Sequence, residues 1–361
     1  MKQILHVGMP KTGSSSIHRT LLHVPPELGV RYLHDHGVNL SRVLATICMD
    51  APEEFPANRR RARSRAELLQ ERKKLQHAIA EGLADPQAST VIMSAEMLTG
   101  LEASAIKALA EWLKPLAPEL QVVSYVRDPF SFVDSMFQTA VRNGKGKFNL
   151  ASHYPEYAKR FRKLEQAFGR TSIRYFAYEP ATFVQGDVVR DFAARLSIDA
   201  SEWQTRRTNV SMSKDAVCLL YMYRKLGPAE PRGNDAVQAT ARFMRLLETL
   251  QGDKARLARD VVQPVIDDKA KDIAWMEKRL GAPFSAMPNK QDDRAIRSED
   301  DLLTLTDNAF DWLKLQGESL DGLGTPNKPN APAICDAMHR LYLAAFDQRS
   351  PPKVKPLQKT L

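Results

Sequence analysis

The sequence predicts an α/β protein, with a central parallel sheet flanked by helices and additional helices in the C-terminal part. Short apolar, β-branched runs alternate with longer segments of helical periodicity up to about residue 205, an alternation typical of parallel sheets covered by helices. Beyond that point the periodicity is mainly helical. Each strand-like run also ends at polar residues, as expected where a parallel sheet binds its ligands.

Three runs are expected to form strands, namely residues 4–7, 90–93 and 122–126. A fourth, weaker run covers residues 172–177, and residues 30–33 are a candidate for a further short strand. Because the carboxyl ends of parallel strands meet at one edge of a sheet, the polar residues that follow these strands are expected to lie close together. The functional site is therefore expected at this edge.

Helical periodicity predicts helices between the strands over residues 64–84, 104–114 and 157–168. In the C-terminal part it predicts helices over residues 214–225, 236–250, 254–279, 302–315 and 334–346. Residues 322–332 are rich in Gly, Pro and Asn and are expected to form a loop. We expect a single domain over residues 1–348, followed by a flexible tail at residues 349–361.

The composition indicates a globular protein that binds an anion. No run of about 18 apolar residues occurs, so a membrane span is not expected, and the apolar run at residues 4–7 is too short for a signal peptide. The three cysteines (Cys48, Cys218 and Cys335) are scattered and form no CxxC pair, which indicates a reducing compartment and a cytoplasmic location. The net charge of +9 favours an anionic partner.

The sharpest basic run is Arg59-Arg60-Arg61-Ala62-Arg63-Ser64-Arg65. It could bind a nucleic acid or an acidic substrate, but no aromatic residue lies directly beside it. Residues of mixed charge follow, so a solvent-exposed helix start is the favoured interpretation, and no nucleic-acid partner is expected.

The most informative segment runs from Ile4 to His18 and predicts a strand, a glycine-containing turn and a helix. The first N–H groups of a helix are free to bind an anion, which the helix dipole also favours, and Gly13 lets the backbone pass close to a phosphate. The side chains that could join the N–H groups are the ammonium of Lys11 and the hydroxyls of Thr12, Ser14, Ser15 and Ser16. The sequence therefore predicts a phosphate-binding loop at residues 11–16, with an ordinary serine-capped turn as the alternative.

This loop comes near the Walker A pattern, because Gly8 and Gly13 have its GxxxxG spacing. Walker A places a lysine directly after the second glycine, where this chain has Ser14. The lysine of this loop, Lys11, lies two residues before that glycine instead. The loop is therefore expected to bind phosphate groups without being the ATP-binding version.

A second candidate anion site follows the third strand. Arg127 ends this strand, and Ser135 falls about two turns into the next helix, on the face that can look back towards Arg127. A guanidinium can bind two oxygens of a phosphate monoester at once. The alternative is that Arg127 pairs with Asp128 or Asp134 and merely ties the helix to the sheet.

Together the two segments resemble the family of sulfotransferases that use 3′-phosphoadenosine 5′-phosphosulfate (PAPS). Pro10-Lys11-Thr12-Gly13-Ser14-Ser15-Ser16 is similar to the family's 5′-phosphosulfate loop. Arg127-Asp128-Pro129, with Ser135 and Phe137, is similar to its 3′-phosphate motif, and Tyr178-Glu179 is similar to a further family feature. The family often has an acid four residues after the arginine, where this chain has Ser131. The resemblance covers about residues 1–215.

The resemblance implies a P-loop-containing, sulfotransferase-like fold that transfers the sulfuryl group of PAPS to a hydroxyl or amine and releases 3′-phosphoadenosine 5′-phosphate (PAP). Lys11 and the loop N–H groups would stabilise charge on the departing phosphate. The acceptor must lose a proton to a base, and our choice is Glu96, because it follows a strand at the same sheet edge. Carbohydrate-modifying members of the family use a glutamate at the corresponding place. The alternative for Glu96 is a role at the start of the next helix.

Histidines are the rival bases, since cytosolic members of the family use one. His34, His36 and His153 remain open for this role, whereas His6 and His18 are poor candidates because they lie in a strand and on the loop helix.

The acceptor itself is not encoded in a readable motif. Glu96 favours a carbohydrate, other small molecules are alternatives, and residues 206–348 are expected to shape the acceptor cleft. The family closes a basic loop over the nucleotide near residues 206–213, but this chain lacks the usual Lys/Arg-Gly pair there, and Ser213 is expected to cap a helix.

No metal ion is expected, because sulfuryl transfer requires none and no aspartate beside the loop calls for Mg²⁺. The alternatives are a P-loop kinase and a non-enzymatic polyanion-binding protein.

Overall fold

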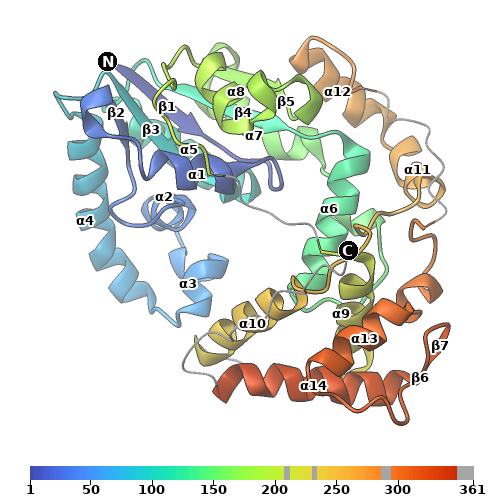
Figure 1. Ribbon diagram of the computed structural model, residues 1–361. Helices are drawn as coiled ribbons and strands as arrows, with labels where there is room; N and C mark the ends of the chain where they lie inside the picture. Colours follow the sequence, from blue (N-terminus) through green and yellow to red (C-terminus); the bar gives the residue numbers. More distant parts are fainter. Residues whose placement is uncertain (207–211, 230–233, 286–293, 348–361) are drawn as a thin grey trace. The chain divides into compact units, whose positions relative to one another are not determined.

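The computed structural model describes residues 1–206, 212–229, 234–285 and 294–347 and has the α/β fold class that the sequence predicts (Figure 1). It contains a five-stranded parallel sheet with the strand order β2-β3-β1-β4-β5. The strands are β1 Lys2–His6, β2 Val30–Tyr32, β3 Thr90–Ser94, β4 Gln121–Val126 and β5 Ile173–Ala177. All five predicted strands are confirmed, including the two weaker ones.

The chain divides into two compact units, each made of several stretches of sequence. The first unit comprises Met1–Phe132, Tyr154–Asn209 and Ile266–Pro288 and contains the sheet, and the second comprises Val133–His153, Val210–Val265 and Asn289–Leu361. The expected single domain over residues 1–348 stays a prediction, and the predicted tail at residues 349–361 lies outside the described residues.

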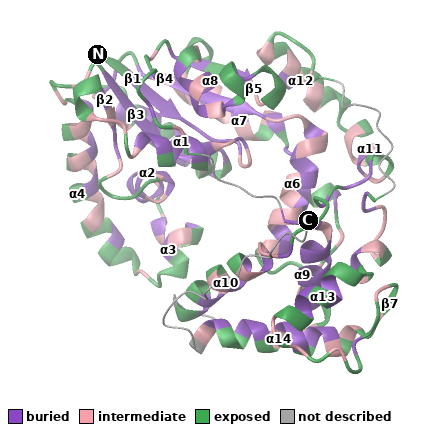
Figure 2. Ribbon diagram, viewed as in Figure 1, coloured by how far each residue is buried: buried purple, intermediate pink, exposed green. Residues whose placement is uncertain are grey.

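In the first unit, helices cover both faces of the sheet (Figure 1). α1 and α8 contact each other over a core that includes Ile4, Ile92 and Val123, while α5 packs on α7. Strands β1 and β3 are buried almost throughout, as a doubly covered parallel sheet requires (Figure 2). The helices of this unit are α1 Ser14–Leu21, α2 Ser41–Cys48, α3 Pro56–Arg60, α4 Arg65–Leu83, α5 Ala103–Leu113, α7 Tyr157–Phe168, α8 Val188–Arg195 and α12 Ala270–Leu280.

The helix α12 completes the first unit from a late part of the sequence. The Asp272 carboxylate accepts the N–H groups of Tyr157 and Ala158, each over 2.8 Å, and so caps the start of α7. In the last turn of α12, Arg279 binds both carboxylate oxygens of Glu165 at 2.8 and 2.9 Å.

The second unit is mainly helical, as predicted. Its helices are α9 Lys214–Leu226, α10 Asn234–Leu247, α13 Asp307–Leu315 and α14 Ala331–Asp347, while α6 Pro129–Arg142 and α11 Arg259–Asp267 span the division between the units. All residues from Asp215 to Tyr223 of α9 are buried, so this helix forms the centre of the unit.

Three predictions in the C-terminal part are wrong in detail. The helix expected over residues 254–279 is two helices, α11 and α12, which are separated at residues 268–269. The first of them begins only at Arg259, because Leu257 forms a β-bridge with Ile296 instead of entering a helix. The helix expected over residues 302–315 begins at Asp307, after a separate 3-10 helix at Asp300–Leu303. The loop expected at residues 322–332 contains the short hairpin β6 Gly324–Thr325 and β7 Lys328–Pro329, and its last residues already belong to α14.

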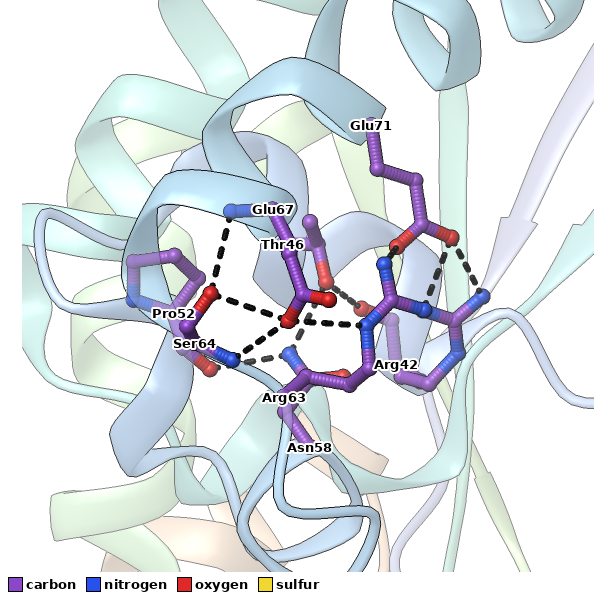
Figure 3. A network of polar contacts seen from close by, with 8 residues as sticks. All are labelled: Arg42, Thr46, Pro52, Asn58, Arg63, Ser64, Glu67 and Glu71. Carbon is purple, nitrogen blue, oxygen red and sulfur yellow. Dashed lines mark hydrogen bonds and ion pairs between the residues drawn. The ribbon is translucent and has the colours of Figure 1, made fainter.

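The basic run at residues 59–65 forms the end of α3 and the start of α4, and the predicted helix start is confirmed. Ser64 caps α4 in a capping box with Glu67, and Arg63 pairs with Glu67 and with Glu71, at 3.5 Å each (Figure 3). Arg42 also donates to Glu71 over 3.1 Å. Glu71 of α4 therefore binds Arg42 of α2 and Arg63 of the basic run at the same time.

Candidate functional site

The predicted phosphate-binding loop lies between the central strand β1 and α1. Its backbone turns through two residues with positive φ, Lys11 at 69° and Gly13 at 80°, and the Thr12 hydroxyl closes the turn by donating to the Met9 carbonyl over 2.6 Å. Within the described residues, the N–H groups of residues 12–15 donate to no backbone carbonyl. They are the orphan donors that a helix N-terminus offers to an anion.

The loop hydroxyls differ in what they can do. Thr12 uses its hydrogen inside the loop, Ser15 is exposed, and Ser16 is buried and has a partner. The Ser14 hydroxyl is buried and has no hydrogen-bond partner among the described residues. Because a buried hydroxyl without a partner is costly, an oxyanion bound to the loop would stabilise Ser14.

Glu96 lies directly against the loop. It begins the 3-10 helix Glu96–Gly100, two residues after β3 ends, and a Cβ added to Gly8 would lie 2.6 Å from its Cγ and 2.8 Å from its Cα. The Thr99 hydroxyl donates to the Gly8 carbonyl over 3.1 Å, and the Met97 N–H donates to the Ser41 hydroxyl over 2.9 Å. The segment that carries Glu96 is therefore held against Gly8, at the start of the turn, and against Ser41 of α2.

The electrostatics of Glu96 suit a proton acceptor. Burial raises the pKa of this carboxyl group, while the charge of Lys11 and a hydrogen bond from the Lys11 N–H act in the opposite direction. A carboxylate whose pKa is raised is a stronger base, and the contact with Lys11 holds it beside the loop.

Arg127 joins the loop from the neighbouring strand β4. Its guanidinium donates to the Lys11 carbonyl over 2.9 Å and to the Ser131 hydroxyl over 2.8 Å. Ser131 in turn donates to the Asp128 carboxylate, so Ser131 connects the arginine to an acid. The loop and Arg127 form one connected structure at the carboxyl ends of β1 and β4.

Tyr178 completes this edge of the sheet after β5, although sequence reasoning did not include it among the site residues. The Arg127 Cζ lies 5.5 Å from the centre of its ring, and a Cβ added to Gly13 would lie 3.4 Å from its Cε2. The signal that could have found it is its place directly after a strand of the sheet.

Ser135 lies on α6, in the part that belongs to the second unit. Its pairing with Arg127 on a common phosphate therefore stays a prediction. The alternative partner Asp134 accepts the Leu257 N–H over 2.8 Å and pairs with Arg256 within the second unit.

Of the rival bases, His34 is half-buried, and its Nδ1–H donates to the Tyr32 carbonyl over 2.9 Å, while its ring stacks on that of Tyr32. His36 is exposed. His153 belongs to the second unit, where burial and the charge of Lys145 lower its pKa. In contrast to these histidines within the described residues, Glu96 contacts the loop, where it accepts a hydrogen bond from the Lys11 N–H.

The basic loop considered at residues 206–213 lies largely outside the described residues, which resume at residue 212. Ser213 is described, and its hydroxyl accepts the Ala216 N–H at the start of α9, so its predicted capping role is confirmed. Among the described residues, no helix is long and apolar enough to cross a membrane, and no group of three or more His, Cys, Asp and Glu side chains is placed to hold a metal ion.

No family model matches the sequence, and no curated protein matches it. One solved structure is similar. It is a sulfotransferase from Alicyclobacillus acidocaldarius, with 14% sequence identity and a TM-score of 0.44, and the alignment covers 79% of this chain and 97% of that chain.

His6 and His18 lie beneath the loop rather than in it. Both are buried, and both hydrogen-bond to the Ser94 hydroxyl, at 2.8 and 2.6 Å. Burial lowers the pKa of His18 to about 4, and burial together with the nearby His18 lowers that of His6 to about 3. Both rings are therefore neutral near pH 7. Both are hydrogen-bonded to Ser94 inside the protein, which does not suit a base that must reach the acceptor.

The free energy of unfolding is expected to fall as the pH drops from about 6.5 to about 4. In the unfolded chain both histidines titrate near pH 6.5, whereas the folded state excludes these protons, so the unfolded state binds more of them. As the pH falls through this window, each histidine lowers the free energy of unfolding by about 1.4 kcal/mol per pH unit. Above about pH 6.5, its full contribution to the free energy of unfolding is present. Urea unfolding at a series of pH values measures the slope.

The matched controls are His18→Gln, which removes one buried titrating ring, and His77→Gln, which removes an exposed one on α4. The first should flatten the slope and the second should leave it unchanged. An equal slope in wild type and His18→Gln would show that His18 does not cause it.

Proposed function

We propose that the protein is a sulfotransferase that transfers the sulfuryl group of PAPS to a hydroxyl or amine of an acceptor and releases PAP. The observation that carries this proposal is the hydrogen bond between the Arg127 guanidinium and the Lys11 carbonyl. It joins a phosphate-binding loop to a second cation at the ends of adjacent strands. PAPS carries anionic groups at both its 5′ and 3′ positions, and a ligand of this kind needs two such sites.

In the proposed reaction, the acceptor oxygen or nitrogen attacks the sulfur in line with the bridging oxygen of the donor. A new bond to sulfur forms while the bond from sulfur to the bridging oxygen breaks, and PAP leaves with the bonding electron pair. Lys11 and the N–H groups of residues 12–15 stabilise the charge that develops on that oxygen. Glu96 takes the proton of the acceptor.

The remaining residues bind the donor and the acceptor. Arg127 binds the 3′-phosphate, and the hydroxyls of Ser14, Ser15 and Ser16 help the loop to bind the 5′ end. The acceptor is a carbohydrate or another small molecule, and residues 206–348 shape its binding. The proposed transfer requires no metal ion.

The test is thermal unfolding of the purified protein with PAP and, separately, with Mg²⁺-ATP. A ligand at about a hundred times its dissociation constant stabilises the folded state by about 2.7 kcal/mol, so PAP is expected to raise the melting temperature. Arg127→Ala should abolish this rise, because the variant loses the charge that binds the 3′-phosphate.

Arg174→Ala is the matched control, since it removes an exposed arginine from the neighbouring strand β5. Each variant is compared with its own melting temperature without ligand. A rise with Mg²⁺-ATP alone would assign the loop to a kinase, and no rise with either nucleotide would contradict both assignments.

A further inference from the structure

A buried chain of three polar side chains connects the elements that carry the proposed site. His6 is the last residue of β1, Ser94 is the last residue of β3, and His18 lies in α1. The exposed fractions of these residues are 0%, 0% and 5%. The Ser94 Oγ lies 2.8 Å from the Nδ1 of His6 and 2.6 Å from the Nε2 of His18.

The direction of these hydrogen bonds follows from an unpaired atom. Ser94 has one hydroxyl hydrogen, so it donates to one histidine and accepts from the other. The Nε2 of His6 is buried without a partner among the described residues, and buried N–H groups without acceptors are rarer than unpaired acceptors. The hydrogen of His6 therefore lies on Nδ1, which donates to Ser94, and Ser94 donates to the Nε2 of His18.

The place of this chain in the fold relates it to the chemistry. His6 and Ser94 are directly paired in the register of β1 and β3. Lys11 follows His6 by five residues, Glu96 follows Ser94 by two, and His18 lies one turn beyond Ser14 in the helix that offers its N–H groups to the anion. The two hydrogen bonds thus join three elements: the end of β1, from which the loop starts, the helix α1 that follows the loop, and the end of β3, which precedes Glu96.

We infer that Ser94, with His6 and His18, is a positioning group that holds Glu96 and the loop helix in the relative geometry that the transfer needs. This inference rests on the proposed function. The reacting groups of an enzyme must be placed closely, and a misplacement of about 1 Å can cost about 10²-fold in rate. Ser94 touches neither the loop nor Glu96 through its hydroxyl, so it acts through the elements that it joins.

The test compares Ser94→Ala with Ser124→Ala. Ser124 is also fully buried in a strand of the same sheet, but within the part of the chain that the structure describes its hydroxyl donates only to the adjacent Tyr125 carbonyl, over 3.2 Å. Ser94→Ala is expected to lower kcat by about 10- to 100-fold, with PAP affinity and acceptor KM within about threefold of wild type. Ser124→Ala should retain kcat within about threefold.

Nitrogen NMR of the histidine rings gives a readout that does not depend on activity. In wild type, the hydrogen of His6 should lie on Nδ1, and the Nε2 of His18 should be a hydrogen-bond acceptor. A second pair of variants covers the case in which Ser94→Ala fails to fold. His18→Gln keeps an acceptor for Ser94 and should retain more turnover than His18→Leu, which keeps none.

The failures of the two proposals are distinguishable. If wild type does not bind PAP, the proposed function fails and the positioning role fails with it. If wild type binds PAP and transfers the sulfuryl group, but Ser94→Ala and Ser124→Ala have equal kcat, then the positioning role alone is overturned. If nitrogen NMR places the hydrogen of His6 on Nε2, the proposed direction of the two hydrogen bonds to Ser94 is wrong, and the positioning role that was argued from it is overturned.

Discussion

Replacing Glu96 with glutamine is expected to lower kcat by about 10²- to 10⁴-fold, the usual loss when a general base is removed. Glutamine has nearly the same shape as glutamate, and its amide oxygen can still accept the Lys11 N–H, so the loop should keep its conformation. PAP binding should therefore stay within about threefold of wild type. Steady-state kinetics with PAPS and an acceptor, together with calorimetric titration of PAP, measure both quantities.

Glu102→Gln is the matched control, because Glu102 lies at the start of α5 on an exposed surface, six residues further along the chain. It should leave kcat and PAP binding unchanged. Near-normal turnover in Glu96→Gln would remove Glu96 from the mechanism. His34, His36 and His153 would then be the next candidates for the base.

Replacing Lys11 with methionine is expected to lower kcat by about 10²- to 10³-fold, the usual loss when one group that stabilises transition-state charge is removed. Methionine keeps much of the length of the lysine side chain and loses its charge. Because Lys11 lowers the pKa of Glu96, its removal should raise that pKa. The acid limb of the pH profile of kcat/KM should therefore move to higher pH in this variant.

Lys107→Met supplies the comparison for this experiment, since Lys107 is an exposed lysine on α5 whose partner is Glu111, at 3.8 Å. It should change neither the rate nor the pH profile. A large fall in kcat without a shifted acid limb would indicate that Lys11 and Glu96 are not coupled in the reacting enzyme.

The parts of the fold and site that the sequence predicts are those with a local signal. The loop could be found because a strand, a glycine turn and a serine-rich helix start follow one another within residues 4–18. The strands were found because apolar, β-branched residues are concentrated in short runs. Glu96 and Arg127 could be placed at the same edge because parallel strands share the direction of their ends.

The parts that could not be predicted depend on partners that are distant in sequence. Nothing near residue 257 shows that Leu257 pairs with Ile296, so helical periodicity was extended across it. The same holds for the hydrogen bonds of Ser94, whose partners lie 88 and 76 residues away. His6 and His18 carry no local pattern that distinguishes a buried network from scattered histidines.

The contribution of α12 to the first unit has a consequence for the order in which the chain can fold on the ribosome. The cap of α7 comes from Asp272, about 115 residues after the helix that it completes, and both units are assembled from stretches that alternate along the sequence. The first unit therefore lacks its last stretch until residue 288 has been made, and the second unit lacks its own last stretch, which begins at Asn289, until the end of synthesis. Such long-range closure slows folding and leaves partly assembled surfaces exposed, so a nascent chain that stops before residue 272 would have an uncapped α7 and become a client for chaperones or proteases.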